Sequence, residues 1–432
     1  MMADYGHGDT SWYVHDRFGM FIHWGLYSMP ARGEWIKSIE KIKEDKYQVY
    51  FDLFDPDQFC PKEWAKAAKD AGMKYFVFTT KHHEGFCLWD TKYSDSSIMH
   101  TGPRRDLLRE VVDAFRAEGL KVGFYYSLID WHHPDFTVDH IHPRLGDGDP
   151  DELDKGKDMK RYQQYMLNQI RELLTNYGKI DVIWYDYSYD RPNLFRGKGR
   201  DAWNSEAIIR LTRELQPDII VDNRLDLPGS ADIETPEQFT PDKTPVDADG
   251  KPLVWEGCQT FSGAWGYHRD ETSWKSVPMC IQLLVNHVSR SGNLLLNVGP
   301  TSRGTFDERA LERLAGIGKW MKANGRSIYG CGSAPEEFPV PPDCRYTWNP
   351  ETNRLYLHCF AWPFKHVILH NLAGKVKYAQ LLFDGSEILF EENNPEVPTN
   401  LAAIIPEGAV KLQLPILLPQ GCEVPVIEIF LK

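Results

Sequence analysis

At 432 residues, the chain is longer than one compact domain normally needs, so we expect a large domain and a smaller second one. Hydrophobic residues make up 42% and charged residues 26%, which suits a buried core and excludes a disordered chain. The formal net charge of -13 argues against a nucleic-acid partner, because phosphate binding needs Lys and Arg gathered on one face.

The N-terminal sequence MMADYGHGDTSW lacks the basic segment followed by an apolar one that marks a secretion signal. No later stretch offers the roughly 18 apolar residues that a membrane span needs. We therefore expect a cytoplasmic protein with no membrane partner, unless a secretion signal was removed. The eight cysteines have no paired spacing, so no disulfide framework is expected.

From Arg17 to about Gly330, short apolar runs alternate with helical patterns, as in parallel β/α units. Seven strands are predicted, at residues 18–25, 74–83, 121–130, 181–188, 218–224, 253–258 and 293–300. An eighth would fall between residues 34 and 54, although no strand pattern is distinct there.

Helical patterns separate these runs. Pro61 begins one helix, which ends before Gly72. Others are predicted at residues 108–119, 157–177, 204–216, 279–290 and 307–324. Neither G-x-G-x-x-G nor a P-loop follows the first strand, so the α/β pattern favours a TIM-like (β/α) barrel over a nucleotide-binding sheet.

After Gly330 the pattern changes to a Pro-rich segment, SAPEEFPVPPD, and then to short alternating strands. The dipeptide Asp384-Gly385 between two such strands is a hairpin signal. We expect a catalytic barrel over residues 1–332 and an antiparallel β-sandwich over residues 333–432.

The active site of a β/α barrel lies at the C-terminal ends of its strands, so polar residues that end an apolar run are the candidates. Six predicted strands end in such residues: His23, His82 and His83, residues 130–133, Asp186, residues 222–224, and Glu256. A lone histidine at a strand end is more often a hydrogen-bonded structural residue. Six such strands together indicate a functional site.

Histidine pairs also raise the question of a metal site. His82 and His83 are adjacent on an extended segment, so their side chains should point to opposite faces, and only one should enter the barrel mouth. We therefore expect no metal.

Two carboxylates about 5 to 5.5 Å apart are the minimum for retaining glycoside hydrolysis, one as nucleophile and one as acid/base. Asp186 ends the apolar run of residues 182–185, where a carboxylate needs either a function or a buried partner. The structural alternative is an ion pair with Arg224 on the next strand. Arg224 would also keep Asp186 ionised, as a nucleophile must be.

Eight motifs occur in a fixed order: FGMFIHWGLYSMPARGEW (18–35), KHHEGFCLWDTKYSD (81–95), GFYYSLIDWHHPDF (123–136), IDVIWYDYS (180–188), DNR (222–224), TPEQF (235–239), WEGC with WGY (255–267) and GNLLLNVGPTSRGTF (292–306). With these motifs the chain resembles the α-L-fucosidases of glycoside hydrolase family 29 over both expected domains.

The resemblance implies a β/α barrel with a C-terminal β-sandwich, hydrolysis with net retention, and neither metal nor cofactor. In similar enzymes the Asp of the W-x-D strand is the nucleophile, which corresponds to Asp186. The fucose pocket would be built by His23, Glu34, Trp35, His82, His83, Tyr126, Trp184 and Arg224, with Trp265 against the methyl group of the sugar. Polar side chains of these kinds suit its hydroxyl groups, and indole rings suit its apolar edge.

The acid/base differs in position between subgroups of this family, and it often follows the sixth strand. The T-P-E motif matches it to Glu237. Glu256 in WEGC is the main alternative, with a sugar hydroxyl or a buried neighbour as its non-catalytic partner, and Glu234 is a third candidate. A raised pKa is expected for whichever glutamate acts as the acid.

We therefore expect an enzyme that removes terminal α-L-fucose from fucosylated oligosaccharides or glycoconjugates through a covalent β-fucosyl intermediate on Asp186. The alternatives are a catalytically inactive fucose-binding barrel protein and a retaining glycosidase for a related sugar, such as an α-L-galactoside. The expected partner is a glycan, and similar enzymes are often oligomeric, which is compatible with a homo-oligomer.

Overall fold

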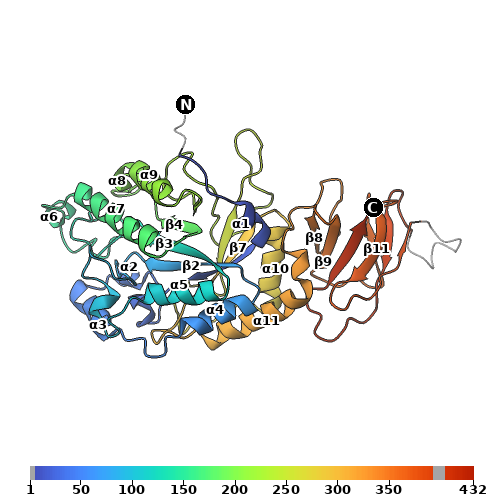
Figure 1. Ribbon diagram of the computed structural model, residues 1–432, viewed down its shortest axis with the longest axis horizontal. Coiled ribbons are helices and arrows are strands. Elements are labelled where there is room, and N and C mark those ends of the chain that lie inside the picture. Colours follow the sequence, from blue (N-terminus) through green and yellow to red (C-terminus); the bar gives the residue numbers. More distant parts are fainter. Residues whose placement is uncertain (1–4, 393–403) are drawn as a thin grey trace.

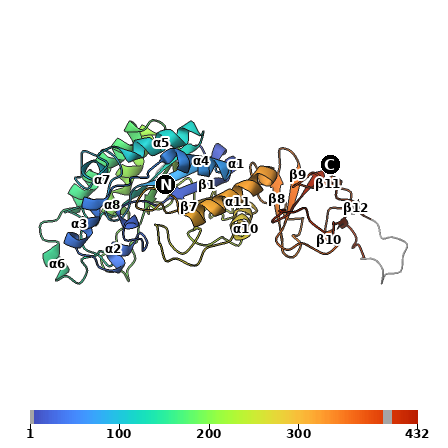
Figure 2. The ribbon, with the colours of Figure 1, turned by 90° about the horizontal axis from the view of Figure 1, so that it is seen from below.

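The computed structural model describes residues 5–392 and 404–432. The molecule is elongated: parallel strands covered by helices occupy one end, and antiparallel strands occupy the other (Figures 1 and 2). Within these described ranges, no helix is long and apolar enough to cross a membrane.

Seven parallel strands form one curled sheet in the order β5-β4-β3-β2-β1-β7-β6. Their bounds are β1 Phe18–Ile22, β2 Tyr75–Lys81, β3 Lys121–Ser127, β4 Val182–Asp186, β5 Ile220–Val221, β6 Glu256–Thr260 and β7 Asn293–Val298. Alternate side chains, among them Phe21, Tyr125 and Trp184, form an inward-facing cluster, and the others pack against the helices. All seven predicted strands are confirmed, although β5 keeps only two residues.

Residues 232–238 fill the gap between the edge strands β5 and β6. The amide of Asp232 donates to the carbonyl of Val221 on β5 at 2.8 Å, and Glu234 and Glu237 pair in parallel with residues 255 and 258 on the β6 side. Ile233 belongs to the inward-facing cluster of the strands. This segment therefore takes the eighth place in the barrel without forming a regular strand.

The prediction of an eighth strand between residues 34 and 54 is wrong. That stretch forms two helices, α2 (Ile36–Ile39) and α3 (Glu44–Leu53). The true eighth segment, DIETPEQ, has no alternation of apolar residues, and Pro236 cannot donate a hydrogen bond to a neighbouring strand. Its sequence consequently gave no strand signal.

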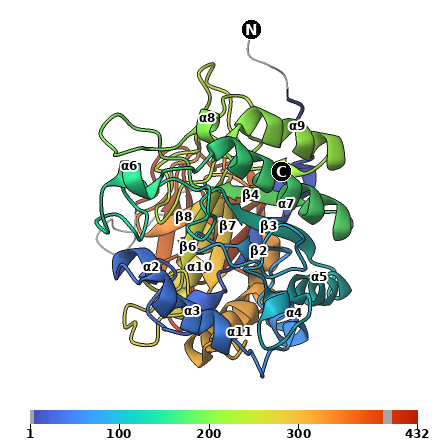
Figure 3. The same ribbon diagram turned by 90° about the vertical axis from the view of Figure 1, so that its left-hand side faces the viewer.

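Helices cover the outer face of the curled sheet. In Figure 3, α11, α4, α5, α7 and α9 follow one another around the strands. A typical contact joins Phe115 on α5 to Phe76 on β2, with ring centroids 4.0 Å apart. All the predicted helices are confirmed. The bounds are α1 Ser11–Asp16, α4 Pro61–Asp70, α5 Leu107–Ala117, α6 Pro150–Leu153, α7 Met159–Asn176, α8 Arg200–Trp203, α9 Ser205–Leu215, α10 Val277–Val288 and α11 Glu308–Asn324, with 3-10 turns η1 Leu26–Ser28, η2 Ile98–His100 and η3 Gly325–Ser327.

Two antiparallel sheets follow, in the orders β11-β14-β9-β8 and β10-β13-β12. Leu357, Ile427 and Leu412 from both sheets share one buried cluster, as in a sandwich. The hairpin predicted at Asp384-Gly385 is confirmed, because the amide of Leu381 donates to the carbonyl of Ser386 at 2.8 Å. The strands are β8 Cys344–Asn349, β9 Arg354–Cys359, β10 His366–Leu369, β11 Val376–Leu381, β12 Phe390–Glu391, β13 Val410–Gln413 and β14 Val426–Leu431.

Candidate active site

A pocket opens at the C-terminal ends of the parallel strands. Its walls are formed by Phe21, His23, Trp35, His82, His83, Tyr125, Trp184, Asp186, Tyr187, Arg224, Glu237, Cys258 and Trp265. Nine of these residues were predicted from the sequence. The other four, Phe21, Tyr125, Tyr187 and Cys258, were not.

Asp186 and Glu237 share one guanidinium in this pocket. Asp186 ends β4, and its Oδ2 accepts a hydrogen bond from the Tyr125 hydroxyl at 2.7 Å. Arg224 Nη1 lies 3.0 Å from Asp186 Oδ1 and 2.8 Å from Glu237 Oε2. Because both oxygens contact the same nitrogen, they are at most about 6 Å apart, which is compatible with the separation found in retaining glycosidases.

Arg224 is itself held in place by its surroundings. Its guanidinium carbon lies 4.8 Å from the centre of the Trp184 ring, and Nη2 donates to the carbonyl of Thr235 at 3.3 Å. Burial lowers the pKa of Arg224, but the charges of Asp186 and Glu237 outweigh burial, so the net pKa is raised. The guanidinium therefore remains charged between the two carboxylates.

Glu256 lies beneath the pocket rather than in it. Its side chain is fully buried, Oε1 accepts from Trp184 Nε1 at 3.1 Å, and Oε2 accepts from the Tyr75 hydroxyl. Burial raises the pKa of Glu256 to about 7. A raised pKa is expected of a general acid, but this carboxyl group cannot reach a substrate. The alternative assignment of Glu256 as the acid is therefore wrong, and its observed role is to hold Trp184.

Glu234, the third candidate, also lies outside the walls of the pocket. Its Oε2 accepts from Asn223 Nδ2 at 2.5 Å, and its backbone pairs with that of Trp255. Of the three glutamates considered, only Glu237 faces Asp186 across the pocket.

The prediction that Tyr126 lines the pocket is wrong, because its neighbour Tyr125 does so. Adjacent residues on a strand point to opposite faces, and on β3 it is Tyr125 that points inward. Tyr126 points outward, where its hydroxyl donates to Gln169 Oε1 at 2.9 Å. Two successive tyrosines left the phase of this strand ambiguous in the sequence. Phe21 did carry a signal, since it precedes the inward-facing His23 by two residues.

Glu34 does not line the pocket either. It is buried, and its Oε2 accepts from the amide of Gly266 at 2.8 Å. The adjacent residue Trp265 packs against His23, with ring centroids 5.1 Å apart. In this structure Glu34 therefore holds the loop that carries Trp265.

His82 and His83 both reach the pocket, contrary to the prediction that only one could. Strand β2 ends at Lys81, and the chain then turns, with the Gly85 amide donating to the carbonyl of His82 at 3.0 Å. The alternation of an extended strand no longer applies there, and the two rings lie 4.0 Å apart. No three His, Cys, Asp or Glu side chains among the described residues are arranged to hold a metal ion.

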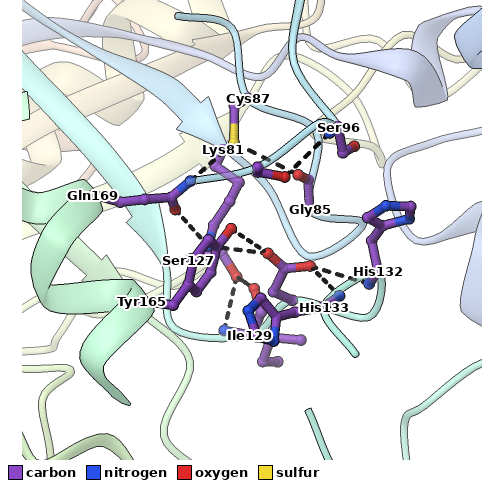
Figure 4. Close-up of polar contacts among 12 residues, drawn as sticks. Lys81, Gly85, Cys87, Ser96, Ser127, Ile129, His132, His133, Tyr165 and Gln169 are labelled. Carbon is purple, nitrogen blue, oxygen red and sulfur yellow. Dashed lines mark hydrogen bonds and ion pairs between the residues drawn. The ribbon is translucent and has the colours of Figure 1, made fainter. Parts of the chain in front are cut away.

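A buried network of polar side chains holds the turn after β2 in place (Figure 4). Lys81 Nζ lies 3.4 Å from Asp130 Oδ2, which also accepts from the Tyr165 hydroxyl at 2.8 Å. Asp130 Oδ1 accepts from the amides of His132 and His133, each at 3.0 Å. One ion pair thus joins the ends of β2 and β3, which carry the pocket residues.

Hydrogen bonds fix the protonated nitrogen of two pocket imidazoles. His23 Nδ1 lies 2.7 Å from Asn297 Oδ1, whose amide nitrogen already donates to the carbonyl of Trp265. His83 Nδ1 lies 2.7 Å from Ser127 Oγ, whose proton goes to the carbonyl of Ile129. Both Nδ1 atoms must therefore be donors. Burial lowers the pKa of both rings well below the usual range, so each is neutral with Nε2 as an acceptor.

A second cavity of about 450 Å³ adjoins the pocket. Tyr187 and Arg224 line both spaces. Tyr187 has a backbone φ of 98°, which is strained for a non-glycine residue, and its ring contacts Trp35 and His83. Polar side chains predominate in the second cavity: His140, Ser188, Tyr189, Arg191, Asn223, Asp226 and Thr235, beside Leu194.

Known proteins resemble the chain over both of its parts. The family model described as Alpha-L-fucosidase matches residues 7–326. Plasma alpha-L-fucosidase of Homo sapiens is 31% identical over 390 residues, which cover 82% of this chain and 76% of that protein. Alpha-L-fucosidase isoenzyme 1 from Paenibacillus thiaminolyticus has a TM-score of 0.89 at 44% identity, covering 98% of both chains. A Bacteroides thetaiotaomicron alpha-L-fucosidase of family GH29, solved as a trapped covalent intermediate, has a TM-score of 0.82 at 29% identity, covering 100% of both chains.

Proposed function

The chain belongs to the alpha-L-fucosidase family, and on that premise we propose that it hydrolyses terminal α-L-fucosides of fucosylated glycans with retention of configuration. The observation that carries the proposal is the pairing of Asp186 and Glu237 on one guanidinium nitrogen. Retaining hydrolysis needs two carboxyl groups at this kind of spacing, one on each side of the bond that breaks.

Asp186 is the nucleophile in this mechanism. One of its oxygens attacks the anomeric carbon while the bond to the leaving oxygen breaks, and Glu237 gives its proton to that oxygen. The products of this step are a β-fucosyl ester of Asp186 and the released alcohol. Hydrogen bonds from Tyr125 and Arg224 hold the carboxyl group of Asp186 in position for the attack.

Arg224 supplies the counter-charge in both half-reactions. It first faces the ionised Asp186, and when esterification removes that charge, it stabilises the ionised Glu237 instead. Glu237 then takes a proton from a water molecule, whose oxygen attacks the anomeric carbon and displaces Asp186. Two inversions release α-L-fucose with its original configuration.

The walls of the pocket match the two faces of a deoxy sugar. Neutral His23 and His83 accept hydrogen bonds from sugar hydroxyl groups through Nε2. Trp265 and Phe21, whose ring centroids lie 5.9 Å apart, form an apolar wall suited to the methyl group on carbon 5 of fucose.

We assign the leaving group to the second cavity. Glu237 contacts Arg224, and Arg224 with Tyr187 borders both spaces, so the acid lies at their junction. An acid must stand beside the departing oxygen, which joins the fucose to the next sugar. The polar side chains of the second cavity suit a hydrophilic sugar as that leaving group.

The test of the nucleophile is Asp186→Gly. Hydrolysis of 4-nitrophenyl α-L-fucoside should fall by at least about 10³-fold, because no covalent intermediate can form. Azide, as an external nucleophile, should restore part of the activity. Nuclear magnetic resonance should detect α-L-fucose as the first product of the unmodified enzyme.

The test of the acid is Glu237→Ala. It should slow natural oligosaccharides far more than the activated aryl fucoside, because only poor leaving groups need protonation. An α-fucosyl azide should form when azide is present, because azide displaces Asp186 from the β-fucosyl ester with inversion. Substantial activity of Asp186→Gly without azide, or equal losses on both substrates for Glu237→Ala, would contradict these roles. Binding of fucose by the unmodified protein without any turnover would favour the inactive binding protein.

A further inference from the structure

Glu84 carries a buried carboxylate with no hydrogen-bond partner in the described structure. It follows His83 in the turn after β2, its side chain is only 2% exposed, and both of its oxygens are unpartnered. An ionisable group placed this way costs free energy, because water has been removed and no donor replaces it. Such an exception calls for a functional explanation.

The nearest ring nitrogen to this carboxylate belongs to the pocket residue His82. His82 Nδ1 lies 3.6 Å from Glu84 Oε2, which is the distance of an ion-pair contact rather than a hydrogen bond. His82 Nδ1 is also buried and has no other partner among the described residues. Both side chains are nearly inaccessible, so their electrostatic interaction is weakly screened by solvent.

Two buried tyrosines and a small cavity surround the carboxylate of Glu84. The hydroxyl groups of Tyr27 and Tyr47 are buried and unpartnered, and the charge of Glu84 adds to the burial that raises the pKa of both. A cavity of about 160 Å³, bordered by Lys37 and Asp95, lies beside the carboxylate. Neither tyrosine donates a hydrogen bond to Glu84, and among the described residues it is His82 that has a ring nitrogen within ion-pair distance of the carboxylate.

We propose that Glu84 is a positioning residue that keeps a proton on His82 Nδ1, so that His82 Nε2 faces the sugar as an acceptor. A negative charge beside one ring nitrogen favours the tautomer with its proton on that nitrogen. His23 and His83 already have this tautomer through Asn297 and Ser127. With His82 included, three neighbouring imidazoles present three acceptors to the sugar.

This inference rests on the proposed function for the identity of the sugar. It also limits the set of sugars that the pocket can bind tightly. Three acceptors require three hydroxyl groups that donate their protons in the same direction. Fucose has three free hydroxyl groups besides the anomeric one. A sugar that lacks a hydroxyl opposite one ring would leave a buried acceptor unpaired, and such pockets discriminate strongly.

The test compares Glu84→Met with Glu84→Gln. Methionine fills the space with apolar atoms, whereas glutamine keeps an oxygen that can face Nδ1. Glu84→Met should weaken inhibition by free fucose about 10- to 100-fold, as losses of orienting partners do, and Glu84→Gln should stay closer to the unmodified protein. The melting temperature of Glu84→Met should stay the same or rise, because a buried charge without a hydrogen-bond partner is removed.

A second readout reports the tautomer directly. Nitrogen-15 spectra of labelled histidine should place the His82 proton on Nδ1 in the unmodified protein and in Glu84→Gln, and release it in Glu84→Met. Asp95→Asn is the matched control, because Asp95 is an exposed carboxylate on the same cavity, and it should change neither readout.

Two results for Glu84→Met would overturn the proposal. The first is a lower melting temperature with unchanged inhibition by fucose, which would mean that Glu84 has a structural role. The second is an unchanged tautomer of His82. Failure of the proposed function is distinguishable, because the spectra are recorded without sugar. In that case the tautomer would respond to Glu84 although the unmodified protein neither binds fucose nor hydrolyses fucosides.

Discussion

A general acid needs a suitable pKa and access to the substrate, and Glu237 and Glu256 show that these two requirements can be met by different residues. Glu256 has the environment that raises a carboxyl pKa, since it is fully buried, but it has no route to a substrate. Glu237 faces Asp186 and is 42% exposed, so it can reach a leaving group. A pKa shift marks a candidate, but the position of the side chain decides its role.

Glu256 leads to a prediction about stability and pH. The ordinary pKa of a glutamate side chain, 4.5, applies to Glu256 in the unfolded chain, and burial raises it to about 7 in the folded protein. Between these values the unfolded chain has lost a proton that the folded protein keeps, so the free energy of unfolding falls as pH rises from about 4.5 to about 7. Above about pH 7 this loss in the free energy of unfolding no longer changes with pH, and it is on the order of 3 kcal/mol.

The variant Glu256→Gln removes this titration. Its free energy of unfolding relative to the unmodified protein should therefore rise between pH 5 and pH 8, as measured by urea denaturation at both values. Activity on oligosaccharides, whose leaving groups need protonation, should persist, because Glu256 is not the acid. A stability difference that does not depend on pH would contradict the raised pKa.

Arg191 tests the assignment of the leaving-group cavity. It borders this cavity, is exposed, and has no ion-pair partner among the described residues. Arg191→Ala should lower kcat/KM for a fucosylated oligosaccharide about tenfold, the value of one hydrogen bond to a charged group, and leave the aryl fucoside within about twofold. Arg104→Ala, an exposed arginine outside this cavity, is the control, and equal effects on both substrates would refute the assignment.

At the scale of elements, the segment 232–238 decides where the acid stands. It carries Glu237, and Asp232 anchors its start. The Asp232 carboxylate is 1% exposed and accepts from the amides of Val221 and Gly8 at 2.8 and 2.9 Å and from Arg213 Nη2 at 2.6 Å. A segment without a regular hydrogen-bond ladder depends on such side-chain contacts for its position.

Asp232→Ala should destabilise the protein by about 3–5 kcal/mol, because it leaves the buried Arg213 without its partner. It should also lower kcat for oligosaccharides, since Glu237 loses its fixed distance from Asp186. Urea denaturation and steady-state kinetics measure the two effects. The exposed pair of Asp57 with Arg303 is the control, and Asp57→Ala should cost no more than about 1 kcal/mol. A similar small loss for Asp232→Ala would argue against the anchor.

At the scale of the whole molecule, the barrel and the sandwich share buried surface. Trp320 on α11 donates from Nε1 to the carbonyl of Val424 at 3.1 Å, and Tyr356 and Val426 of the sandwich belong to the main hydrophobic cluster of the barrel. A continuous core predicts that the two parts unfold together.

Trp320→Ala should cost about 3–5 kcal/mol and separate the single calorimetric transition into two, because the contact between the parts is lost. The aryl fucosidase activity at low temperature should change little, since Trp320 is not one of the residues that line the pocket. An unchanged single transition would contradict the shared core. The boundary at residues 332 and 333, the cytoplasmic location and a homo-oligomer stay predictions.

Much of this protein was predictable from the sequence because its signals are local. Alternation and helical periodicity predicted seven strands and their helices, and the apolar run before Asp186 marked that carboxylate as exceptional. Trp184 and Asp186, two residues apart on one strand, had to share a face. The motifs were specific enough to indicate the family.

Only the tertiary structure decided which tyrosine faces inward, which glutamate stands opposite Asp186, and which segment completes the barrel. Tyr125 and Tyr126 are indistinguishable until the phase of their strand is known. Glu237 and Glu256 lie on neighbouring elements, but one points into the pocket and the other beneath it. Sequence periodicity reports the face of a single strand, whereas the distance between side chains on different strands depends on how the sheet curls and closes.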